Sequence, residues 1–178
     1  NFLINGQLIK DVQEFKELTK TNKRKNSFWR QVNRYNAKVP RYEKISDLAY
    51  ALKSQNAEAV FTLNLITSTV ENEIEMLKEA QKNEIEIKYV ELGNEINSEN
   101  LITKHFYPNA QAYTDTCINW SKKILKEFPN VKIGLVGGNK NERLAQWNQS
   151  LVKAIEKHFD NNKDQFYFIL HYYPHFKS

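Results

Sequence analysis

Side chains that could transfer a proton or bind a hydroxylated ligand occur in this sequence where apolar runs end. They are Asn64, Asn94, Glu95, Asn139, His171 and Tyr173. A carboxylic acid surrounded by amide, imidazole and phenol groups offers the donors and acceptors that a polyol such as a sugar requires. Each residue also has a structural alternative: Glu95 could accept backbone N–H groups at a strand corner, Asn64 could cap a helix, and His171 could be a hydrogen-bonded core residue.

The apolar runs have the length of strands, and the segments between them have helical periodicity. The first run, residues 59–65, is nearly continuous and predicts a strand buried on both faces. Ser68 and Glu71 have the spacing of a capping box before a helix. The expected strands are 59–65, 85–92, 131–136 and 166–173; the expected helices lie over 46–56, 70–77, 113–124 and 144–155.

Strands joined by crossover helices pair in parallel, so the fold class is α/β. The spacing of 26 to 46 residues between strand starts suits a (β/α)8 TIM barrel. A whole barrel needs about 250 residues, so this chain would supply only part of one, about strands two to six. The open alternative is a five-stranded doubly wound sheet of flavodoxin type.

The amino-terminal segment, residues 1–44, differs from residues 45–178. It has eleven Lys and Arg and four Asp and Glu, a net charge of +7, while the remainder has a net charge of −2. Asn5-Gly6 between two apolar triplets predicts a hairpin, and Val12 begins a helical pattern. Lys23-Arg24-Lys25 fits a solvated loop better than an anion site, because no nucleic-acid motif accompanies it.

Composition excludes several classes of protein. Cys117 is the only cysteine, so an internal disulfide and a cysteine zinc cluster are impossible, and its place in a helical apolar stripe predicts a core residue. No apolar run reaches the length of a membrane span, and the first residues lack a signal-peptide pattern. The chain opens on Asn1, so its start does not reveal its compartment. No metal-site spacing occurs, and no cofactor is expected.

The segment Lys88–Glu95 reads KYVELGNE and carries the most specific signal in the chain. It resembles the end of the fourth barrel strand in clan A glycoside hydrolases, particularly families 51, 39 and 79. The resemblance implies that Glu95 is the general acid/base and that Asn94 binds the sugar 2-hydroxyl. His171-Tyr172-Tyr173-Pro174 is similar to the end of strand six, where a His and a Tyr line the catalytic pocket. The likeness covers residues 45–178.

Two departures from the family pattern stand out. The Arg-x-Pro-Gly-Gly segment typical near strand two is absent, and the nucleophile of these enzymes ends strand seven, beyond Ser178. The missing strands and the second carboxylate would come from further chain or from a second chain.

The resemblance predicts a retaining glycoside hydrolase that acts on a polysaccharide or oligosaccharide, without nucleic acid or a membrane span. It favours a secreted or cell-surface protein. One alternative is a carbohydrate-binding module that has lost hydrolytic activity. The other is a flavodoxin-like binding domain in which the motif is coincidental.

Overall fold

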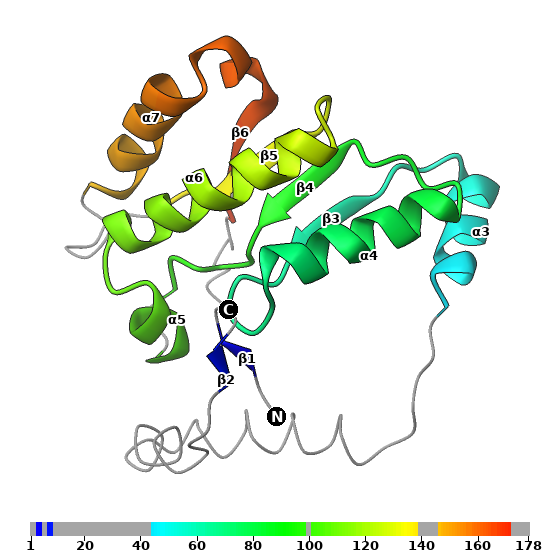
Figure 1. The fold of residues 1–178 in the computed structure, drawn as a ribbon, viewed down its shortest axis with the longest axis horizontal. Helices are drawn as coiled ribbons and strands as arrows, with labels where there is room; N and C mark the ends of the chain where they lie inside the picture. Colours follow the sequence, from blue (N-terminus) through cyan, green and yellow to red (C-terminus); the bar gives the residue numbers. More distant parts are fainter. Residues whose placement is uncertain (1–2, 5–6, 9–43, 99–100, 139–145, 172–178) are drawn as a thin grey trace, which may run out of the picture.

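The computed structural model describes residues 3–4, 7–8, 44–98, 101–138 and 146–171 (Figure 1). The strands are β1 (Leu3–Ile4), β2 (Gln7–Leu8), β3 (Val60–Leu63), β4 (Tyr89–Leu92), β5 (Lys132–Val136) and β6 (Phe166–Ile169). The helices are α3 (Ile45–Gln55), α4 (Val70–Lys82), α5 (Leu101–Phe106), α6 (Ala110–Glu127), α7 (Trp147–His158) and the 3₁₀ helix η2 (Asp160–Gln165).

Strands β3 to β6 form one parallel sheet in which the strands follow their order in the sequence, β3-β4-β5-β6. The α/β class and the parallel sheet with crossover helices are therefore confirmed. The flavodoxin order 2-1-3-4-5 requires a reversal of direction within the sheet. Among the strands that the structure describes in this sheet, the order contains no such reversal.

Helices cover one face of this sheet. Figure 1 shows α4 and α6 lying across it, with α7 next to α6 on the side of β6. Right-handed crossovers that always step to the same side place every helix on the same face. Five strand residues that point toward the helices are at most 1% exposed; they are Leu63, Val90, Leu92, Ile133 and Leu135.

The other face of the sheet, called the open face below, has no helix packed on it among the described residues, and its outer strand β3 corrects one prediction. Residues 59–65 were expected to form a strand buried on both faces, yet Val60 is 53% exposed and Thr62 is exposed. The apolar run reflects contact of Phe61 and Leu63 with the helices, together with a position at the end of the described sheet. A face without helices is the one that a barrel would enclose.

Local sequence signals explain most element boundaries. Asn56, in the left-handed conformation, ends α3, and Asn109 caps α6 by accepting a hydrogen bond from the N–H of Ala112. Helix α4 begins at Val70, as expected, but its cap is Thr69 rather than Ser68: the hydroxyl of Thr69 accepts from the N–H of Asn72. The predicted capping box of Ser68 and Glu71 is thus wrong, because the hydroxyl of the next residue, Thr69, takes the cap position.

Two further predictions fall on described residues. Strands β1 and β2 pair in antiparallel fashion, with Leu3 opposite Leu8, as a hairpin requires; the predicted turn at Asn5-Gly6 lies outside the described residues. Cys117 is 4% exposed within α6, and burial raises the pKa of its thiol, as expected for a core residue. The expected helix from Val12 lies outside the described residues.

Candidate functional site

The segment that leaves β4 makes a tight turn at the carboxyl end of the sheet. Gly93 has a φ of 88°, a conformation that residues with a side chain avoid. Ile96 folds back over it: a Cβ on Gly93 would lie 2.5 Å from Cγ1 of Ile96, which is 1% exposed. Glycine is therefore required at this position for the turn to close.

Glu95 lies at the centre of this turn. Its φ of 48° is also left-handed, and its carbonyl oxygen accepts a hydrogen bond from the N–H of Ser98 at 2.8 Å. Its side chain is 40% exposed, and the neighbouring Asn94 is exposed. A backbone conformation that costs about 1 kcal/mol or more for a residue with a side chain is the kind of strain that clusters at functional sites.

His171 follows a strand two positions away in the sheet, and its side chain contacts that of Glu95. It follows the end of β6, and its Nδ1 lies 3.2 Å from Oε1 of Glu95. The side chain of His171 is 38% exposed, so the pair is open to solvent and to a ligand. A carboxyl group and an imidazole at this distance can share, accept or donate a proton near neutral pH.

Strand β5 lies between β4 and β6, and its one glycine, Gly134, leaves space above the strand for a side chain from β6. A Cβ on Gly134 would lie 2.7 Å from the ring of Tyr167, so this ring occupies the space above β5. The Tyr167 hydroxyl reaches 3.4 Å from the carbonyl oxygen of Val90 on β4. Gly134 on the middle strand thus lets the Tyr167 side chain of β6 approach β4.

Asn64 is at the carboxyl end of β3 and is exposed, but its amide is used by its own loop. Its Oδ1 accepts hydrogen bonds from the N–H groups of Ile66 and Thr67, at 3.1 and 3.0 Å, and its Nδ2 donates to the hydroxyl of Thr67. The helix-capping role is taken by Thr69. The structure therefore places Asn64 at the predicted end of the sheet with a turn-forming role.

The remaining predicted residues are Tyr173 and Asn139, which lie outside the described residues. Of the predicted set, the structure brings Glu95 and His171 into contact and leaves Asn94 exposed beside them.

Three residues on the open face were not singled out as site candidates. Oγ1 of Thr62 donates to Oε2 of Glu91 at 3.1 Å, and the ring of Tyr167 lies on the same face. Burial, followed by the charge of Glu91, raises the pKa of Tyr167 to about 12, so its hydroxyl is protonated at neutral pH. Strand alternation could have identified Tyr167 from the sequence. It lies four residues before His171, and an even spacing along a strand places two side chains on the same face.

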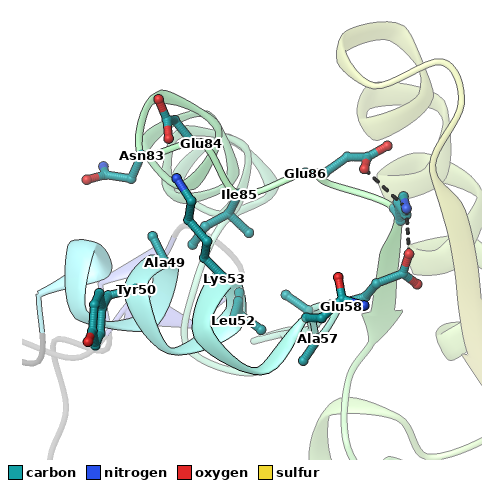
Figure 2. A pocket seen from close by; sticks show the side chains of 13 residues that line it. Ala49, Tyr50, Leu52, Lys53, Ala57, Glu58, Asn83, Glu84, Ile85 and Glu86 are labelled. Carbon is teal, nitrogen blue, oxygen red and sulfur yellow. Dashed lines mark hydrogen bonds and ion pairs between the residues drawn. The ribbon is translucent and has the colours of Figure 1, made fainter.

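A hollow of about 710 Å³ lies at the opposite end of the sheet (Figure 2). Helix α3 and the segments preceding β3 and β4 line it, with Leu52 and Ile85 forming part of the apolar surface. On its rim the ammonium group of Lys88 pairs with Glu58 and Glu86. Because it adjoins the amino ends of the strands, it is separate from the Glu95–His171 pair.

The fold and the paired side chains define an α/β protein with a parallel sheet and a carboxyl–imidazole pair at its carboxyl end. No protein-family model matches the chain, and no curated protein matches its sequence. Within the described ranges, no group of three or more His, Cys, Asp and Glu could hold a metal ion. None of the helices described by the structure is both long and apolar enough to cross a membrane.

Proposed function

We propose that the chain is part of a retaining glycoside hydrolase of clan A type, with Glu95 as the general acid/base. The observation that carries the proposal is the contact of Glu95 with His171 at the carboxyl end of a parallel sheet. That end gathers the reacting groups in (β/α)8 enzymes. The motif ELGNE supports the same role, and the sequential strand order is compatible with a barrel segment.

The proposed reaction is a double displacement. The protonated Glu95 carboxyl donates its proton to the glycosidic oxygen as the bond to the leaving group breaks, and a second carboxylate attacks the anomeric carbon. The Glu95 carboxylate then takes a proton from the water that hydrolyses the glycosyl-enzyme. The second carboxylate would lie about 5 to 5.5 Å away and would come from a seventh strand.

His171 and Asn94 are the proposed neighbours of the reacting groups. His171 would orient the Glu95 carboxyl and exchange hydrogen bonds with sugar hydroxyls, and Asn94 would bind the 2-hydroxyl. Tyr173 is the further proposed sugar-binding residue, whereas Asn64 directs its amide into its own loop.

The test is the dependence of the rate on the leaving group. In the complete gene product, Glu95→Gln should slow the hydrolysis of aryl glycosides with poor leaving groups far more than of those with good ones, because only the former need the proton. Glu95→Ala should regain activity with azide, which attacks the glycosyl-enzyme without general-base assistance.

Glu75→Gln, on the exposed side of α4, is the matched control and should leave every rate unchanged. An equal loss on all leaving groups would remove Glu95 from the acid/base role. Sugar binding without hydrolysis in the unaltered protein would favour the binding module instead.

A further inference from the structure

The hydroxyl of Tyr113 is inserted between β4 and β5 at the point where their pairing stops. It donates to the carbonyl oxygen of Leu92 at 2.7 Å and accepts from the N–H of Val136 at 2.9 Å. At the other end of this strand pair, the N–H of Lys132 donates directly to the carbonyl oxygen of Lys88. Further along, the same offset would pair the N–H of Val136 with the carbonyl oxygen of Leu92, and the Tyr113 hydroxyl lies between these two groups.

The position of the Tyr113 ring is fixed by its neighbours on the helical face. The residue is fully buried, its ring stacks on Trp147 with centroids 5.1 Å apart, and Tyr107 packs edge-on at 5.5 Å. Burial raises the pKa of its hydroxyl, which therefore keeps the proton that it donates to Leu92. A rigid ring holds the two strands apart at one defined place.

The turn that follows begins at this separation and is fixed again at its other end. The N–H of Gly93 donates to the carbonyl oxygen of Glu91 at 3.0 Å rather than joining the ladder. After Glu95, Nδ2 of Asn97 donates to the carbonyl oxygen of Gly137 at 2.7 Å, which joins the turn to the end of β5. Both bonds hold residues 93–97, and Glu95 lies between them.

We propose that Tyr113 and Asn97 are positioning residues that clamp the turn 93–97 at its two ends and so hold the Glu95 carboxylate against His171. The inference rests on the proposed function for its meaning, because that function makes Glu95 the reacting group. Without the hydroxyl, the Val136 N–H and the Leu92 carbonyl oxygen can bond directly. Pairing would then extend toward Gly93 and move the turn.

The experiment measures the contact itself by NMR of the His171 ring in the 21.0 kDa protein. Replacing Glu95 by Gln shifts the ring signals of His171 when the two side chains touch. This shift is compared in the unaltered chain, in Tyr113→Phe, in Asn97→Ala and in Tyr107→Phe. Tyr107→Phe is the matched control, since its buried hydroxyl also donates to a backbone carbonyl, that of Leu65 beyond β3.

We expect the Glu95-dependent shift of His171 to be lost in Tyr113→Phe and Asn97→Ala and retained in Tyr107→Phe. A shift retained in folded Tyr113→Phe would reduce Tyr113 to a packing role and overturn the proposal. If Tyr113→Phe lacks the dispersed spectrum of a folded protein, Asn97→Ala decides in the same way. The readout is the His171 signal and not hydrolysis. If the unaltered protein shows the Glu95-dependent shift but hydrolyses no glycoside, the result contradicts the proposed function and leaves the positioning role of Tyr113 and Asn97 standing.

Discussion

At the scale of single residues, the carboxyl end of the sheet holds two kinds of polar side chain: those that form turns and those that meet across strands. Glu95 is held in a left-handed backbone conformation, and its carboxylate meets His171 from a strand two positions away. Asn64 instead directs its oxygen and its amide nitrogen into its own loop. A position at a strand end therefore does not by itself make a polar residue part of the site.

The two roles of Asn64 can be measured apart. Asn64→Ala should lower the free energy of unfolding by about 1 kcal/mol, because two backbone N–H groups lose their acceptor. Asn64→Asp keeps that oxygen and should stay within about 0.5 kcal/mol, a change typical of surface substitutions. Urea unfolding gives both values. Equal stability of the two variants would show that the loop does not depend on this acceptor. Asn64 would then be available to bind the sugar.

At the scale of elements, helices α4 and α6 connect the strands and tie the helical layer together. Lys123 on α6 bonds to Glu71 on α4 at 2.6 Å, and Lys78 on α4 pairs with Glu127 on α6. These pairs are exposed and so add little stability in salt. The buried stripe of α6, which includes Tyr113, Cys117 and Ile124, provides the larger share of the packing.

The start of α4 gives a test with an adjacent control. Thr69→Ala should cost about 1 kcal/mol of unfolding free energy, because the N–H of Asn72 loses its cap. Ser68→Ala should change it by less than about 0.5 kcal/mol, since its hydroxyl makes only a long bond of 3.4 Å to a backbone carbonyl oxygen. Thermal or urea unfolding of the pair checks the assignment, and the reverse order of effects would move the cap to Ser68.

At the scale of the whole molecule, the described sheet ends at β3 and β6 and leaves one face without helices. A barrel would enclose that face and continue the sheet at both ends, so the proposed function implies further strands. The exposed fraction of 53% at Val60 and of 37% at Phe168 marks the two outer strands. An unpaired strand edge offers backbone groups to any added strand.

Hydrogen exchange can locate these edges. Amides of β4 and β5 should exchange slowest, because both strands are paired on both sides and their helix-facing residues are fully buried. Amides of β3 that point away from β4 should exchange much faster than those that point toward it. NMR or mass spectrometry measures both sets. Slow exchange on the outer side of β3 would show that a further strand already covers this edge.

The sequence by itself determined the alternation of strands and helices, the parallel pairing and the core position of Cys117. Periodicity is a local property, and a buried stripe or a strand-length apolar run keeps its meaning in any arrangement of neighbours. The same reasoning placed polar residues at one end of the sheet. It could not tell Ser68 from Thr69 as a cap, because both hydroxyls have a suitable position and only the exact start of the helix decides.

Only the tertiary structure decided which of those polar residues meet. Glu95 and His171 are 76 residues apart, and their contact depends on the strand order and on the turn at Gly93. The exposure of Val60 likewise follows from where β3 lies in the sheet. The Tyr113 hydroxyl between Leu92 and Val136 has no signature in the sequence. A tyrosine in an apolar helical stripe predicts only a core residue, and the position of its hydroxyl between two strands becomes apparent only in the folded structure.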